Sequence, residues 1–151
     1  MDEDRIRQIV GDMRFFNGKT DMAIDEIAMV QPGLGRIMPE IGARTWKLYY
    51  AGKAENWPYA MYQYKETKKL FELGAITRPK HEDAIEEYLR DSWQPLEAAI
   101  QEEDLEKFLA AFDQAVDDAN AWHEKKEKAF IVWQVPDHPP PDIDFHKNKR
   151  K

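Results

Sequence analysis

Histidine is the side chain in this sequence best suited to bind a metal ion, because the chain contains four histidines and no cysteine. His123 lies in a segment of helical periodicity, whereas His81, His138 and His146 lie at a helix start, in a Pro-rich segment and near the chain end. No two of them have the spacing that places two ligands on one helix face. The sequence therefore predicts no zinc or di-iron site and leaves His123 as the single candidate metal ligand.

Motifs for catalysis are missing from the sequence. There is no nucleophile elbow, no Gly-rich phosphate loop and no thiol. The acidic clusters Glu102–Asp104 and Asp117–Asp118 could bind a cation weakly, but charge runs on amphipathic helices are usually solvated faces. We predict that the protein is not an enzyme and has no catalytic residue.

The overall charge argues against nucleic acid as a partner. The 151 residues carry a formal net charge of -7 and the sequence pI is about 5.2, so the field of the whole molecule repels phosphate backbones. No apolar run approaches the ~18 residues that cross a bilayer, and Met1–Asp4 lacks the basic-then-apolar order of a signal peptide. We expect a soluble protein without membrane insertion.

The spacing of apolar residues predicts an all-α fold, an antiparallel four-helix bundle with a short N-terminal helix. The short helix occupies residues 1–18 and ends at Asn17-Gly18. The expected bundle helices are 20–52 with a break at 32–35, 56–74 capped by Asn56, a helix after Pro79 that reaches Ile100 and bends at Pro95, and Leu105–Trp122.

The predicted bundle spans residues 20–128, and residues 129–151 are expected to form an extended, Pro-rich tail within one domain, 1–151. Phe130–Val135 is apolar and β-branched, but Pro136 and Pro139–Pro141 argue against a sheet strand. The basic terminus, His146–Lys151, is expected to be mobile.

Three stretches together carry a resemblance to a known family. They are Arg44–Gly52 with Asn56-Trp57, Pro95–Ile100, and Phe130–Pro136 with Pro140-Pro141. They resemble the small bacterial cytochrome c-like (class II cytochrome c-like) four-helix bundles, over residues 34–145. The resemblance implies a periplasmic protein whose Cys-x-x-Cys-His haem motif falls on Ala119-Asn120-Ala121-Trp122-His123. Both cysteine positions are replaced and the histidine position is kept.

Loss of both cysteines excludes covalent haem, because thioether attachment needs two sulfur atoms. A void of several hundred Å³ would cost on the order of 10 kcal/mol. We therefore predict that Trp122 fills the former haem site, together with Trp93, Tyr88, Phe112 and Trp133. The favoured function is a non-catalytic binding or protein-interaction module without a cofactor. Natural loss and engineered removal of the cysteines both remain open.

The alternative is an electron-transfer or sensing protein that holds haem b without covalent bonds. His123 would then ligate the iron, with Ala119 and Trp122 beside the haem. The second axial ligand would be one of four methionines: Met38, or else Met13, Met22 or Met61.

Aromatic residues are concentrated between the second half of one predicted helix and the start of the next. They are Trp46, Tyr49, Tyr50, Trp57, Tyr59, Tyr62 and Tyr64. If exposed, the first six would form an interaction surface for a homodimer or another protein partner. If buried, the rings would seal one end of the bundle with their polar tips in water.

Overall fold

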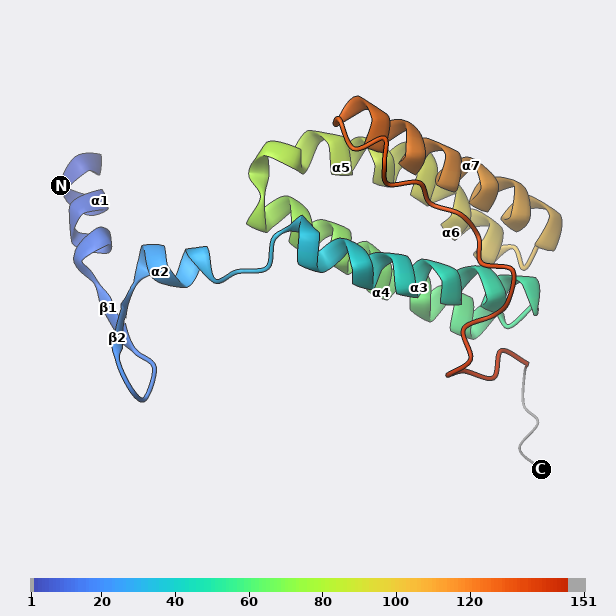
Figure 1. Cartoon of the computed structure of the whole chain (residues 1–151), viewed down its shortest axis with the longest axis horizontal. Helices are drawn as coiled ribbons and strands as arrows, with labels where there is room; N and C mark the ends of the chain where they lie inside the picture. Colours follow the sequence, from blue (N-terminus) through green and yellow to red (C-terminus); the bar gives the residue numbers. More distant parts are fainter. Residues whose placement is uncertain (1, 147–151) are drawn as a thin grey trace. The chain divides into compact units, whose positions relative to one another are not determined.

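The computed structural model describes residues 2–146 and is mostly helical (Figure 1). The chain divides into two compact units, Met1–Gly33 and Leu34–Lys151, rather than forming the single domain that the sequence predicted. The boundary falls at Pro32-Gly33, where proline interrupts the helix because it lacks a backbone N–H. Residues 20–33 therefore belong to the N-terminal unit and not, as predicted, to the first helix of the bundle.

The N-terminal unit contains short elements and no buried residue in its described part. Its elements are α1 (Glu3–Asp12), β1 (Arg14–Phe16), β2 (Asp21–Ala23) and α2 (Ile24–Met29). We predicted that Asn17-Gly18 ends the first helix. In the structure these residues instead lie in the turn of the antiparallel β1–β2 hairpin. The Asn17 side chain accepts hydrogen bonds from the Lys19 and Thr20 amides, and Gly18 has a φ of 93° that favours glycine.

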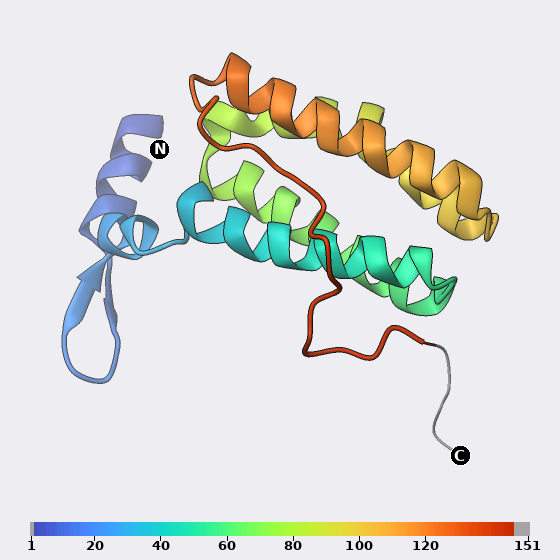
Figure 2. The same cartoon turned by 45° about the vertical axis from the view of Figure 1, so that its right-hand side comes forward.

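The second unit begins with two long helices, α3 (Leu34–Lys53) and α4 (Trp57–Thr77), which pack against each other (Figure 2). Asn56 caps α4 as predicted, because its side-chain oxygen accepts a hydrogen bond from the Tyr59 amide at 3.4 Å. Gly52 has a tertiary role as well as lying near the end of α3. A Cβ at this position would lie 2.2 Å from Phe108, so only glycine lets that ring approach so closely.

The third predicted helix is divided into four consecutive helical segments of different type. It consists of η1 (Pro79–His81), α5 (Glu82–Tyr88), the π-helical turn η2 (Leu89–Trp93) and α6 (Gln94–Gln101). Pro95 follows the π-helical turn. Proline has no backbone N–H to donate to the carbonyl of the residue four positions earlier, and its ring crowds that carbonyl. A locally widened turn accommodates both effects. The widened turn carries Ser92 and Trp93, both of which are buried.

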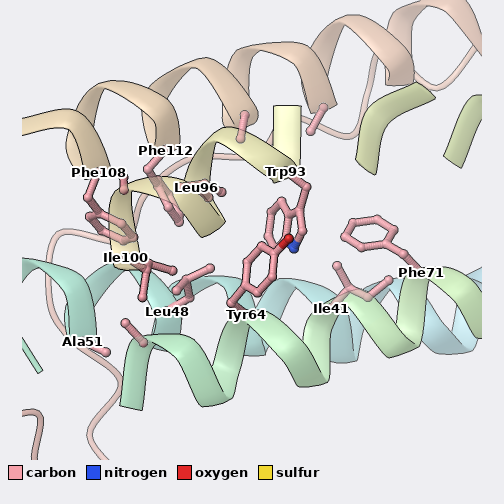
Figure 3. Close-up of a cluster of buried hydrophobic side chains, with 14 of the residues drawn as sticks. Ile41, Leu48, Ala51, Tyr64, Phe71, Trp93, Leu96, Ile100, Phe108 and Phe112 are labelled. Carbon is pink, nitrogen blue, oxygen red and sulfur yellow. The ribbon is translucent and has the colours of Figure 1, made fainter. Parts of the chain in front are cut away.

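Helix α7 (Leu105–Lys125) confirms the clearest pattern in the sequence. Asp104 caps it by accepting a hydrogen bond from the Lys107 amide at 3.0 Å. Phe108, Phe112, Ala115 and Ala119 form its buried stripe. The largest fully buried side chains of the unit come from α3, α4, η2, α6 and α7 and include Trp93, Tyr64, Phe108 and Phe112 (Figure 3).

Residues 126–146 leave α7 and run across α7 and α3 without forming a helix or strand in the described part (Figures 1 and 2). Trp133, Val135 and Ile143 pack against the core, and Phe145 is buried. Phe130 and Val132 are exposed. The basic residues 147–151, predicted to be mobile, lie outside the described residues.

Candidate functional site

An open pocket of about 830 Å³ lies in the second unit beside Ala119 and His123. Its walls come from the start and middle of α3, from Phe71 of α4, from η1 and α5, from the C-terminal end of α7 and from the segment 131–134. Its largest lining side chains include Trp46, Phe71, Tyr88, Trp122 and Trp133. The pocket is wide enough for a small organic molecule of the size that proteins commonly enclose.

The structure brings together all four residues that the sequence proposed for a cofactor. His123, Trp122, Ala119 and Met38 line this one pocket, although Met38 lies on α3 and the other three on α7. Of the other methionines considered, Met61 does not line the pocket. Met13 and Met22 belong to the N-terminal unit.

The prediction that aromatic side chains fill this space is wrong, because the pocket remains open beside Ala119. Trp93 is fully buried elsewhere, stacked on Tyr64 with ring centroids 5.9 Å apart (Figure 3). Trp122 is only partly buried, and the ammonium group of Lys125 lies 4.2 Å from its ring centroid. Tyr88 and Trp133 do reach the site, but as walls. Large rings alone do not fill a space whose shape is set by the helices around it.

His123 contributes an imidazole whose Nδ1 atom is buried and has no hydrogen-bond partner among residues 2–146. Its ring packs edge-to-face against Trp133, with centroids 6.1 Å apart. Trp133 is fixed in turn by Asn120, whose side chain donates to the Trp133 carbonyl at 3.0 Å and accepts from the Trp133 amide at 2.7 Å. The Asn120 side chain thus attaches the residues after α7 to that helix and sets one wall of the pocket.

The charges around the pocket differ in sign from those of the whole chain. His81, Lys126 and Lys128 line it, and no described lining residue is Asp or Glu. Burial lowers the pKa of His81, and the positive charges of Lys80 and Lys126 lower it further. Neither lysine was predicted from the sequence, and His81 was placed only at a helix start. The signal available was the pair of lysines next to the apolar run 130–133.

A smaller, polar pocket of about 300 Å³ lies on the other side of Trp122. Ser92 donates a hydrogen bond to Asp118 at 2.6 Å, and Gln114 donates to the other oxygen of the same carboxylate at 2.9 Å. No histidine is among the described residues that line this pocket. Within residues 2–146, no group of three His, Asp or Glu side chains could hold a metal ion.

The predicted aromatic interaction surface is largely covered by the chain itself. Trp57 is buried, and Trp46, Tyr49, Tyr50 and Tyr59 are partly buried against the core. Phe145 packs against Tyr50 and Tyr59, and Trp133 packs against Trp46. Only Tyr62 of the predicted six is exposed. Of the two alternatives, burial holds for most of these residues. Rings of α7 pack on Trp57 and Tyr49, and the polypeptide after α7 packs on Trp46, Tyr50 and Tyr59.

Comparison of the chain with protein-family models, with curated proteins and with solved structures finds no match. The resemblance to cytochrome c-like proteins therefore remains a prediction from the sequence. No helix among the described residues has the length and apolar character needed to cross a membrane.

Proposed function

We propose that this protein is a non-catalytic binding module whose pocket beside His123 holds a bulky, apolar small molecule. The observation that carries the proposal is the open pocket of about 830 Å³ walled by aromatic and aliphatic side chains. Apolar walls gain roughly 25 cal/mol for each Å² that a ligand removes from water. Leaving such walls in water is unfavourable, so a ligand-binding role accounts for a space that the chain's own side chains do not fill.

The proposal includes the predicted four-helix bundle as the scaffold. Its members would be α3, α4, the segment from α5 to α6, and α7. The packing of α3 on α4, of α6 on α7 and of α3 on α7 supports this arrangement. Several walls of the pocket would then be rigid helices, and Trp133 would be held against them by Asn120.

Aromatic walls favour a ligand with a flat apolar body. Trp46 and Trp133 meet edge-to-face at 5.4 Å, and both line the pocket with Tyr88. Rings at such walls bind flat molecules through offset stacking and edge contacts. A rigid, planar ligand also loses little conformational entropy when it binds.

Titration with Nile red, a neutral dye whose fluorescence rises in apolar surroundings, tests the proposal. We expect saturable binding by the unmodified chain and loss of binding in Ala119→Trp, which fills the pocket from α7. Ala121→Trp is the matched control, because Ala121 lies on α7 outside this pocket and should leave binding unchanged. If Ala119→Trp fails to fold by circular dichroism, Gly42→Leu gives the same test from α3. Equal dye binding by correctly folded blocked and unblocked chains would refute the proposal.

Non-covalent haem is the second candidate, because His123 and Met38 line the same pocket. The residues fit haem in their donor types and in the space available. Haem would be held by His123, with Met38 as the second ligand, and when bound it would supply redox or gas-binding chemistry. Haem is placed second because the Nδ1 atom of His123 lacks the acceptor that usually orients a ligating imidazole.

Haemin titration separates the two candidates. A sharp Soret band that is lost in His123→Ala and changed in Met38→Leu would support haem. Met61→Leu is the matched control, because Met61 lies on α4 outside the pocket. Nile red binding without any haemin-dependent band would leave the general binding function and exclude haem.

A further inference from the structure

The basic side chains at the pocket are unusual for this chain. The chain has 29 acidic and 22 basic residues, yet His81, Lys126 and Lys128 line the pocket without any described Asp or Glu beside them. They come from η1 and from the turn that follows α7, two elements far apart in the sequence. A chance selection of surface residues from an acidic chain would favour carboxylates.

The basic groups are close enough to act on one another. The positive charge of Lys126 contributes to lowering the pKa of His81, so the two side chains face the same region. Neither Lys126 nor Lys128 forms an ion pair with a carboxylate in the described part of the chain. The Lys126 ammonium instead lies 5.6 Å from the centroid of the Trp122 ring, and the Lys128 ammonium lies 5.5 Å from the centroid of the Phe130 ring. A ring contact does not use all three N–H groups of an ammonium, so N–H groups are left for an external acceptor.

Lysines are favoured near the negative C-terminal end of a helix dipole, but this effect explains only part of the placement of basic residues at the pocket. That effect fades within the last turn of a helix, where Lys125 already lies and packs on Trp122. Lys128 lies beyond the end of α7, and His81 lies on a different element. The dipole gives no reason for these two residues to line the pocket.

We propose that the ligand is an anionic amphiphile whose apolar body occupies the pocket and whose carboxylate binds Lys126, Lys128 and His81. This inference rests on the proposed binding function and specifies the class of ligand. A carboxylate accepts charge-assisted hydrogen bonds from the two ammonium groups, and such bonds are about twice as strong as neutral ones. The imidazole of His81 donates a further N–H to the same group.

Two pyrene probes that differ only in the head group test this inference. Pyrenebutyrate carries a carboxylate, and pyrenebutanol carries a hydroxyl on the same apolar body. We expect the unmodified chain to bind the acid about tenfold more tightly than the alcohol at low salt. The double variant Lys126→Gln/Lys128→Gln should bind both probes with similar affinity, and raising the salt concentration should reduce the preference of the unmodified chain.

Lys125→Gln is the matched control, because Lys125 lies one residue earlier and does not line this pocket. It should keep the full preference for the acid. Equal affinities for the two probes in the unmodified chain, or a preference that survives in the double variant, would overturn the anionic-ligand inference while Nile red binding still supports the pocket. Failure of Nile red and of both pyrene probes to bind would overturn the binding function itself.

Discussion

Two single residues, Gly52 and Tyr88, make contacts with distant helices that local sequence patterns do not predict. Gly52 permits the close approach of Phe108, and Tyr88 places a phenol in the core with its hydroxyl donating to the Ala115 carbonyl at 2.9 Å. Both residues connect helices that are distant in the sequence. Their energetic effects can be measured one substitution at a time.

Gly52→Ala should destabilise the protein by about 1–3 kcal/mol, because the added Cβ would overlap the Phe108 ring. Gly35→Ala on the same helix is the control, since nothing lies within 4 Å of its added Cβ. That change should be neutral or stabilise the helix by up to about 1 kcal/mol. Urea unfolding measures both. A Gly52→Ala chain as stable as the unmodified one would contradict the described packing of α3 on α7.

Buried tyrosines predict a loss of stability at alkaline pH. Burial raises the pKa of Tyr88 and also that of Tyr64, whose hydroxyl hydrogen-bonds Glu97. A tyrosine in the unfolded chain ionises near pH 10. Above that pH the unfolded state binds fewer protons than the folded state, so the free energy of unfolding should fall as pH rises. Below it, these residues should give no pH dependence.

Denaturant unfolding between pH 8 and pH 11.5 measures this slope. Tyr88→Phe should make it shallower and cost about 0.5–1.5 kcal/mol at pH 8 through the lost hydrogen bond to Ala115. Tyr62→Phe is the control, because Tyr62 is exposed and should leave the slope unchanged. An identical slope in all three chains would show that Tyr88 is not buried as described.

At the scale of elements, the segment after α7 determines which surfaces are open. It has no regular hydrogen-bonded structure of its own in the described residues, so side-chain contacts hold it in place. Asn120 binds Trp133 by two hydrogen bonds, Tyr50 donates to the Pro136 carbonyl, and Asn56 donates to the Phe145 carbonyl. The same segment forms one wall of the pocket and packs on Trp46, Tyr50 and Tyr59 of α3 and α4.

Asn120→Ala should free Trp133 from α7, because both of its hydrogen bonds to Asn120 are lost. We expect faster hydrogen exchange at residues 130–135 and weaker Nile red binding, with a stability loss of about 1–2 kcal/mol. Gln114→Ala is the control, since the Gln114 side chain donates its hydrogen bond to Asp118 on the same helix. Unchanged exchange in Asn120→Ala would mean that packing of Trp133 alone holds this wall.

At the scale of the whole molecule, the two units differ in how much apolar surface they bury. The second unit has a continuous core from α3 to Phe145, whereas no described residue of the N-terminal unit is buried. Ile6, Ile9, Val10 and Phe16 remain exposed in that unit. Burial is the main source of folding free energy, so the two units should differ in local stability.

Hydrogen exchange by mass spectrometry should reveal this difference. Amides of α1 and α2 should exchange within seconds to minutes, while amides of α4 and α7 should be protected to nearly the global free energy of unfolding. A dilution series provides the control, because protection that depends on concentration would indicate association between chains. Protection of α1 equal to that of α7 at low concentration would contradict the prediction.

Local residue patterns were enough to predict the elements whose signals lie within one helix or turn. The apolar stripe of α7, the Asn56 cap of α4 and the lack of thioether chemistry follow from residue types and spacing within one turn or one element. The sequence also pointed to His123, Trp122, Ala119 and Met38, which the structure brings to one pocket. The first three predictions needed only the identities of neighbouring residues, whereas the four pocket residues came from the resemblance to the cytochrome c-like bundles.

Three features depend on how the helices pack in space: whether the pocket is filled, which charges line it and which aromatic rings are exposed. Whether Trp93 or Trp122 enters a space depends on the widened turn before Pro95 and on how closely α3 and α7 approach. The convergence of His81 with Lys126 depends on contacts between elements far apart in the chain. Packing is a property of several helices together, so no pattern within one of them can specify the volume left between them.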